Sequence, residues 1–196
     1  MLDSNHCMHA TFLKSAVNID GLPKSDKPQI ALLGRSNVGK SSLLNNLMDQ
    51  KGLAKVSATP GRTQMINVFD VDKRFFLIDL PGYGFAKTSK VKRVAFEGLL
   101  NHYLNRSENF RLALVIIDAR LGPTDIDREM FAFLEDTRKP FAIIANKIDK
   151  LTKNEVGQLT KMLADDYPGV TVILHSNVTK AGAGEIRQLI EKTITK

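Results

Sequence analysis

The sequence contains almost no cysteine and no long apolar run. Its single cysteine, Cys7, excludes an intramolecular disulfide and fits a reducing compartment. No apolar stretch is long enough to cross a bilayer, and the N-terminus lacks the charged start and apolar core of a secretory signal. The four histidines lack the spacing of metal ligands, so we expect them to be surface or packing residues. We therefore expect a cytoplasmic monomer with no membrane partner.

Size and charge narrow the protein class further. With 196 residues, of which 43% are hydrophobic and 25% charged, the chain suits one globular domain with a buried core. The formal net charge of +7 favours a polyanionic partner, and nucleic acid is the first candidate. A generally solvated basic surface is the alternative.

Apolar runs alternate with amphipathic stretches from residue 29 onward. This alternation predicts a three-layer α/β domain, in which a mostly parallel six-stranded sheet has one antiparallel strand and helices on both faces. Residues 1–27 are polar and mixed, and we expect a partly loose arm there, followed by one domain over residues 28–196. The expected strands span 29–33, 65–71, 74–78, 112–117, 141–145 and 170–174, and the expected helices 42–48, 91–104, 125–135, 154–165 and 185–195.

A glycine-rich loop joins the first expected strand of this domain to its first helix. The segment from Gly34 to Ser41 fits G-x-x-x-x-G-K-[ST], the phosphate-binding loop (P-loop). Consecutive backbone N–H groups and the positive end of the helix form an anion site there. Lys40 would reach the β- and γ-phosphates, and the Ser41 hydroxyl would bind Mg²⁺. A glycine-rich turn that only caps the helix is the alternative. The pattern predicts a P-loop NTPase domain that binds a nucleoside triphosphate.

Two further segments fit the γ-phosphate and its metal ion. Asp79 follows an apolar strand and would hold Mg²⁺, while the Gly82 N–H would meet a γ-phosphate oxygen. The segment 59–64 lies in a long stretch without periodic structure, where Thr63 would complete the Mg²⁺ shell as a switch. An ordinary Pro-Gly turn is the alternative for this second segment.

The Asn146–Asp149 segment follows another apolar strand and predicts the base. The Asp149 carboxylate can accept hydrogen bonds from both N1–H and the 2-amino group of guanine, whereas adenine would leave it unpaired. Asn146 would bind the base and brace the P-loop, and the Lys147 stem would lie along the ring. A backbone N–H at Ser176–Asn177 would meet the guanine O6. The alternative is that Asp149 caps the next helix.

The predicted site therefore has three functional parts. Lys40, Thr63 and Gly82 are its catalytic residues, and Ser41, Thr63 and Asp79 are its Mg²⁺ ligands. The residues predicted to contact the nucleotide are Gly34, Arg35, Ser36, Asn37, Val38, Gly39, Lys40, Ser41, Ser42, Gly61, Arg62, Thr63, Asp79, Leu80, Pro81, Gly82, Asn146, Lys147, Asp149, Ser176 and Asn177.

With these motifs assembled, the chain resembles the EngB family of bacterial ribosome-biogenesis GTP-binding proteins, within the Era-like GTPases. The segments 34–42, 59–64, 79–84 and 118–124 all read like that family. Family members usually have Thr where Asn146 stands, and a small residue where Asn177 stands. The resemblance implies a slow GTPase that acts in assembly of the large ribosomal subunit and is needed for growth, cell division and septation. Asn37 occupies the loop position that helps to hold K⁺ in related potassium-stimulated GTPases.

Two residue features bear on rate and partner. Tyr83 stands where Ras-type enzymes have the glutamine that orients the attacking water, which predicts slow hydrolysis. The basic cluster Lys87, Lys90, Lys92 and Arg93 follows directly, and we expect it to contact ribosomal RNA phosphates when GTP is bound. Two other functions stay open: a P-loop enzyme that transfers phosphate to a small acceptor, and a nucleotide-binding interaction module whose hydrolysis is incidental.

Overall fold

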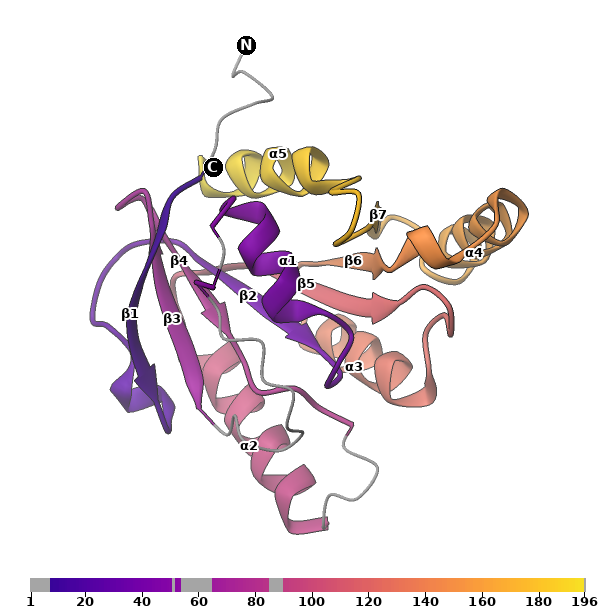
Figure 1. Ribbon diagram of the computed structural model, residues 1–196. Coiled ribbons are helices and arrows are strands. Elements are labelled where there is room, and N and C mark those ends of the chain that lie inside the picture. Colours follow the sequence, from indigo (N-terminus) through magenta and orange to yellow (C-terminus); the bar gives the residue numbers. More distant parts are fainter. Residues whose placement is uncertain (1–7, 51, 54–64, 85–89, 196) are drawn as a thin grey trace.

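The computed structural model describes residues 8–50, 52–53, 65–84 and 90–195. In these ranges the strands form one seven-stranded sheet in the order β1-β3-β4-β2-β5-β6-β7 (Figure 1). The strands are β1 (Ala10–Ala16), β2 (Gln29–Gly34), β3 (Ile66–Val71), β4 (Phe75–Asp79), β5 (Phe110–Asp118), β6 (Phe141–Asn146) and β7 (Thr171–His175). The α-helices are α1 (Lys40–Leu47), α2 (Lys90–Arg106), α3 (Asp125–Asp136), α4 (Lys153–Asp166) and α5 (Ala183–Ile194).

The strands expected at residues 65–71 and 74–78 are confirmed as β3 and β4, which form an antiparallel hairpin. Their turn places Asp72 at φ 50° and Lys73 at φ 57°, and the Arg74 N–H donates to the Val71 carbonyl at 2.9 Å. Two central residues with positive φ match the right-handed twist of the paired strands. β3 runs antiparallel to both of its neighbours, whereas β4, β2, β5, β6 and β7 are parallel. The predicted single antiparallel strand is therefore confirmed.

The edge strand β1 is the main difference from the predicted architecture, which had six strands. It lies inside the segment expected as a partly loose arm, where it pairs antiparallel with β3 from Ala10↔Val71 to Ala16↔Ile66. Only the two end residues of β1 are buried, so the strand has no apolar run that sequence analysis can detect. A register irregularity between Phe12 and Lys14 also interrupts its alternation.

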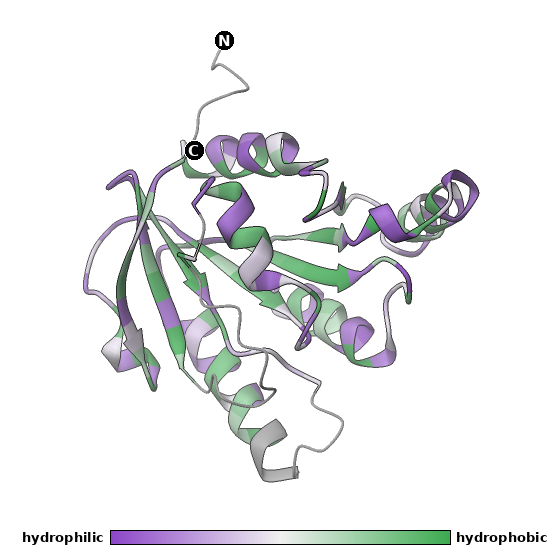
Figure 2. Ribbon diagram, in the orientation of Figure 1, coloured by the Kyte–Doolittle hydropathy of each residue, from purple (hydrophilic) through white to green (hydrophobic). Residues whose placement is uncertain are grey.

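The sheet has a separate hydrophobic core on each face because successive strand residues point to opposite sides. Helices α1 and α5 pack on one face, through Leu43, Leu44 and Leu47 and through Ile186 and Ile190. Helices α2, α3 and α4 pack on the other. Figure 2 shows the apolar strands between helices that carry polar outer faces. None of the described helices is long and apolar enough to span a membrane.

The five parallel strands all end at the same edge of the sheet. β2 ends at Gly34, β4 at Asp79, β5 at Asp118, β6 at Asn146 and β7 at His175. Residues at the ends of the last three strands are direct neighbours, because Asp118 pairs with Asn146 and Asn146 with His175. In α/β sheets ligands bind at this carboxyl edge.

Candidate functional site

The loop from Gly34 to Ser41 lies between β2 and α1, as predicted. Gly39 caps α1 at φ 105°, a conformation that glycine adopts without strain. A Cβ atom there would collide with the Asn146 Nδ2 atom and would lie 2.7 Å from the Asn177 Nδ2 atom. No side chain caps the α1 N-terminus, so its first backbone N–H groups face the loop. The loop and the helix end therefore form an anion-binding geometry.

Lys40 and Asp79 lie close to this loop. The Lys40 Nζ atom donates to the Gly34 carbonyl at 3.2 Å. Burial lowers the pKa of Lys40, and the nearby Asp79 charge partly offsets this effect. Burial likewise raises the pKa of Asp79, against the opposing influence of Lys40 and a hydrogen bond with Asn67. The buried Asp79 Oδ1 atom has no hydrogen-bond partner among the described residues, so it is an oxygen ligand available to a cation.

Gly82 approaches the P-loop closely, which only a residue without a side chain allows. A Cβ atom at residue 82 would lie 2.8 Å from the Ser36 Oγ atom and 3.1 Å from the Lys40 Nζ atom. The next residue continues the contact, because the Ser36 N–H donates to the Tyr83 carbonyl at 3.2 Å. Leu80 and Pro81, between Asp79 and Gly82, are buried.

The segment predicted to recognise the base begins at the end of β6 and is tied to the P-loop through backbone carbonyls. The Lys147 Nζ atom donates to the Asn37 carbonyl at 2.9 Å, and the Asn146 Nδ2 atom donates to the Val38 carbonyl at 2.8 Å. These contacts turn the carbonyls toward the β6 end. They therefore order the loop that is predicted to bind phosphate.

Asp149 lies beside Ser176, in the loop after β7. The Ser176 hydroxyl donates to the Asp149 Oδ1 atom at 2.7 Å, and this hydrogen bond holds the pKa of Asp149 below its ordinary value. The carboxylate is therefore ionised at neutral pH and only accepts hydrogen bonds. Thr152 caps α4 by accepting from the Glu155 N–H, so the alternative interpretation of Asp149 as the cap of that helix is wrong.

The side chain of Asn177 lies between the P-loop and α1. Its Nδ2 atom donates to the Gly39 carbonyl at 3.4 Å, and Asn46 of α1 donates to its Oδ1 atom at 3.2 Å and to its carbonyl at 3.0 Å. Lys147, Asn146 and Asn177 thus hold the consecutive carbonyls of residues 37, 38 and 39.

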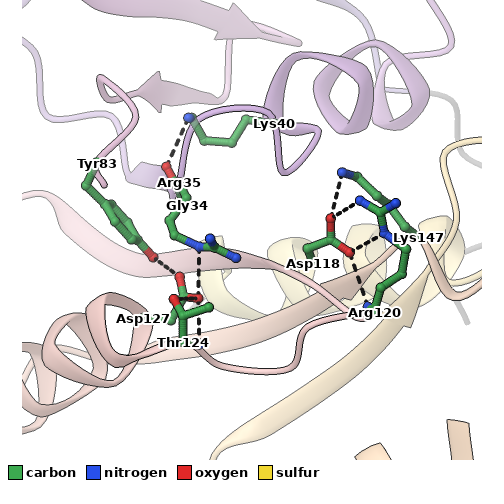
Figure 3. A network of polar contacts seen from close by, with 9 residues as sticks. All are labelled: Gly34, Arg35, Lys40, Tyr83, Asp118, Arg120, Thr124, Asp127 and Lys147. Carbon is green, nitrogen blue, oxygen red and sulfur yellow. Dashed lines mark hydrogen bonds and ion pairs between the residues drawn. The ribbon is translucent and has the colours of Figure 1, made fainter. Parts of the chain in front are cut away.

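Asp118 and His175 belong to the same edge but were not predicted as site residues. The Asp118 Oδ2 atom accepts from Lys147 Nζ at 2.8 Å and from Arg120 Nη2 at 2.6 Å (Figure 3). Burial raises the pKa of Asp118, but the hydrogen bonds from Arg120 and Lys147 outweigh burial and hold it below its ordinary range. Both residues end a parallel strand, and that position was the signal that could have found them.

His175 forms a hydrogen bond with the side chain of Asn146. The fully buried ring lies with Nδ1 3.0 Å from the Asn146 Oδ1 atom. Because Asn146 Nδ2 donates to Val38, its Oδ1 atom faces the ring and Nδ1 is assigned the proton. Burial lowers the pKa of His175 to about 4, so the ring is neutral. The expectation of a packing role fits this histidine.

Several predicted residues lie outside the described part of the chain. Gly61, Arg62 and Thr63 are among them, as is Lys87 of the basic cluster. Arg35, Ser36, Asn37, Ser41 and Ser42 lie in or next to the P-loop as expected. The residues that the structure describes include no cluster of three His, Cys, Asp or Glu side chains able to hold a metal ion. A Mg²⁺ site here would therefore depend on hydroxyl, water and phosphate oxygens beside Asp79.

Comparisons with known proteins agree with this geometry. Residues 29–147 match the family model described as 50S ribosome-binding GTPase. The probable GTP-binding protein EngB of Lactobacillus helveticus is 39% identical over 191 residues, which cover 95% of this chain and 97% of the relative.

Solved structures share the fold. A crystal structure of a probable GTP-binding protein engB is 24% identical with a TM-score of 0.70, covering 85% of this chain and 98% of that one. Era in complex with MgGDPNP and nucleotides 1506–1542 of 16S ribosomal RNA is 29% identical with a TM-score of 0.68, covering 85% of this chain and 56% of that one.

Proposed function

The chain belongs to the EngB family of GTP-binding proteins, and from this premise we propose that it is a GTP-dependent switch in the assembly of the large ribosomal subunit. As a GTPase of this family it binds guanine nucleotides and hydrolyses GTP. The proposal concerns the residues that carry out this activity, the metal ions and the ribosomal partner. Residues 28–196 are taken as one GTP-binding domain.

The contacts between the base-recognition loops and the P-loop carry the assignment of the nucleotide site. Side chains from the loops after β6 and β7 hold the three consecutive carbonyls of residues 37–39, while Asp149 follows in the first of these loops. A nucleotide whose guanine binds Asp149 would have its phosphates at the P-loop, near Lys40. The segment that carries Asp149 also orders this loop. Recognition of the base and of the phosphates therefore depends on one connected structure.

A Mg²⁺ ion fits the donors at the γ-phosphate end of this site. The unpartnered Asp79 Oδ1 atom and the Ser41 hydroxyl are the described ligands, and Thr63 is the third. Such an ion supplies positive charge to the phosphate oxygens. The Lys40 ammonium adds a second positive charge from the P-loop, in a partly buried position where its attraction to phosphate is less screened than at the surface.

Hydrolysis forms a bond between a water oxygen and the γ-phosphorus and breaks the bond from that phosphorus to the bridging oxygen, which leaves with GDP. Tyr83 is poorly suited to orient the water, because a phenol lacks the side-chain amide with which the glutamine of Ras-type enzymes does so. The intrinsic rate is therefore slow. Asn37, which is exposed on the P-loop, would help to hold a K⁺ ion that supplies further positive charge.

The ribosomal part of the proposal draws on relatives and charge. The matching family model is described as 50S ribosome-binding, and the Era structure contains ribosomal RNA. The net charge of +7 and the basic cluster Lys87, Lys90, Lys92 and Arg93 suit RNA phosphates. We propose that this cluster contacts the large ribosomal subunit, or its precursor, in the cytoplasm when GTP is bound. We also propose that loss of the protein slows growth and division.

Nucleotide selectivity tests the guanine assignment. Asp149→Asn should lose affinity for GTP and gain affinity for xanthosine triphosphate, because an amide can donate to the new carbonyl of xanthine. Asp166→Asn, in a surface ion pair with Arg128, is the matched control and should keep the wild-type preference. ATP binding equal to that of GTP would refute the assignment. It would favour instead the phosphate-transfer enzyme considered from the sequence.

Sedimentation tests the ribosomal partner. Purified large subunits should carry the wild-type protein when a non-hydrolysable GTP analogue is bound, and much less of it when GDP is bound. Charge reversal at Lys87, Lys90 and Lys92 should abolish this difference while GTP binding persists. Equal association in both nucleotide states would instead favour an interaction module whose hydrolysis is incidental.

A further inference from the structure

One buried carboxylate, that of Asp127, connects the P-loop to the segment after Gly82. Its side chain is fully buried at the third residue of α3. The Oδ1 atom accepts from the Tyr83 hydroxyl at 3.0 Å, and the Oδ2 atom accepts from the Arg35 Nε atom at 3.1 Å (Figure 3). Thr124 also donates to Oδ2, from its backbone N–H at 3.0 Å and from its hydroxyl at 2.7 Å.

This arrangement exceeds what the helix needs. A carboxylate at the third helical position commonly accepts from the capping residue, and the Thr124 contacts alone fulfil that role. The two additional donors come from sites 44 and 92 residues away in the sequence. Burial, together with the adjacent Asp127 charge, raises the pKa of Tyr83 well above its ordinary value, so its hydroxyl stays protonated and keeps donating.

The same two residues are also joined through their backbones. Arg35 and Tyr83 form an isolated parallel bridge, in which the Ser36 N–H donates to the Tyr83 carbonyl at 3.2 Å. One backbone donor of the P-loop is therefore already engaged by a carbonyl oxygen. While this bond is made, the Ser36 N–H cannot donate to a phosphate oxygen.

The contact also brings Gly82 against the phosphate-binding side of the loop. The Cβ position of Gly82 lies only 3.1 Å from the Lys40 Nζ atom. A γ-phosphate oxygen that binds both Lys40 and the Gly82 N–H has to enter the narrow space between residue 82 and the P-loop. We therefore expect the Gly82–Tyr83 backbone to move outward when a γ-phosphate enters. GDP, which lacks that group, demands no such movement.

We propose that Asp127 is a positioning residue that holds Tyr83 against Arg35 of the P-loop, and that this latch lowers the affinity of the site for GTP relative to GDP. The inference rests on the proposed location of the phosphates. Opening the latch breaks the Tyr83–Asp127 hydrogen bond. GTP binding requires this opening, whereas GDP binding does not. The latch is therefore specific to the third phosphate and indifferent to the base.

Tyr83→Phe is the direct test, because it removes the latch hydroxyl and keeps the ring that packs near Phe96. Dissociation constants are measured for GDP and for a non-hydrolysable GTP analogue. Since hydrogen bonds to charged groups are strong, affinity for the analogue relative to GDP should rise by roughly three- to tenfold. Asp127→Asn, which weakens the acceptor, should shift the ratio in the same direction.

Tyr103→Phe is the matched control. It deletes another buried phenol hydroxyl, which donates to the Gln29 Oε1 atom at 3.0 Å outside the nucleotide site. A general loss of stability would affect both tyrosine variants alike and would leave the affinity ratio unchanged. Thermal unfolding with and without GDP detects misfolding, and if Tyr83→Phe does not fold, Asp127→Asn decides the question.

The outcomes separate the latch from the proposed function. An unchanged ratio in folded Tyr83→Phe, equal to that of Tyr103→Phe, would overturn the latch and leave the nucleotide site standing. If Lys40→Ala bound both nucleotides as well as wild type does, the nucleotides would not bind at the P-loop. That result would overturn both the latch and the proposed function.

Discussion

Replacing Asp118 by asparagine should weaken guanine-nucleotide binding without changing the preference for guanine. Asp118 contacts the P-loop through Lys147, whose ammonium lies between the Asp118 Oδ2 atom at 2.8 Å and the Asn37 carbonyl at 2.9 Å. Asparagine has nearly the same shape but no charge. Lys147 then keeps its acceptor on the P-loop and loses the carboxylate that fixes its stem, which we predict to lie along the base.

The structure sets the size of this effect. Hydrogen bonds that involve charged groups contribute about 1.5–3 kcal/mol, and solvent screening lowers that contribution. The Asp118 side chain is 6% exposed and that of Lys147 is 26% exposed, so screening is partial. We therefore expect a loss of about 1–2 kcal/mol in binding, which raises the dissociation constant for GDP by roughly 5- to 30-fold.

Calorimetric titration with GDP measures the change, and xanthosine diphosphate serves as the selectivity probe. Arg120→Gln is the matched control, because Arg120 also binds the Asp118 carboxylate but its own side chain is 49% exposed and donates to Asp118 rather than to the P-loop. It should weaken GDP binding by less than about threefold. If folded Asp118→Asn binds GDP like wild type, or if both variants lose the same affinity, positioning of Lys147 by Asp118 is refuted.

Three further predictions concern the same edge of the sheet. Asn177→Ala removes the donor to the Gly39 carbonyl and should weaken GDP and GTP binding alike, by a few-fold, in equilibrium titrations. The His175 pKa of about 4 lies below the unfolded value of about 6.5, so the unfolding free energy should be constant above pH 6.5 and fall by up to about 3 kcal/mol toward pH 4. Denaturant titrations should show this loss in wild type and a smaller one in His175→Asn. Replacing K⁺ by Na⁺ should slow GTP turnover, and an unchanged rate would refute a K⁺ site at Asn37.

Most of the sheet could be predicted because its strands are buried on both faces. The segments that became β5 and β6 are continuous apolar runs, and such runs have few alternatives in a chain with interspersed amphipathic helices. β1 could not be found in this way. It is an edge strand whose five central residues are exposed, and its backbone pairing with β3 leaves no mark on side-chain composition.

The motifs predicted the site for a related reason. Phosphate binding requires glycines and an N-terminal helix end, and guanine recognition requires a carboxylate, so local chemistry restricts the residue types at Gly39, Lys40 and Asp149. Asn177 shows the limit of this reasoning. Its predicted contact with guanine concerns its backbone, whereas the structure shows its side chain behind the P-loop, beside Asn46.

Residues that support others are harder to recognise, because their role depends on the partner that the fold brings to them. Asp127 reads in the sequence as an acidic residue in the first turn of a helix, an arrangement that stabilises any helix. What distinguishes it is its place in the fold. The first turn of α3 lies beside the segments that follow β2 and β4, so Arg35 and Tyr83 both reach the Asp127 carboxylate. Two loops that are predicted to contact the γ-phosphate thereby share one acceptor. We therefore expect a change at one loop to affect the other, and a nucleotide-dependent switch requires such coupling.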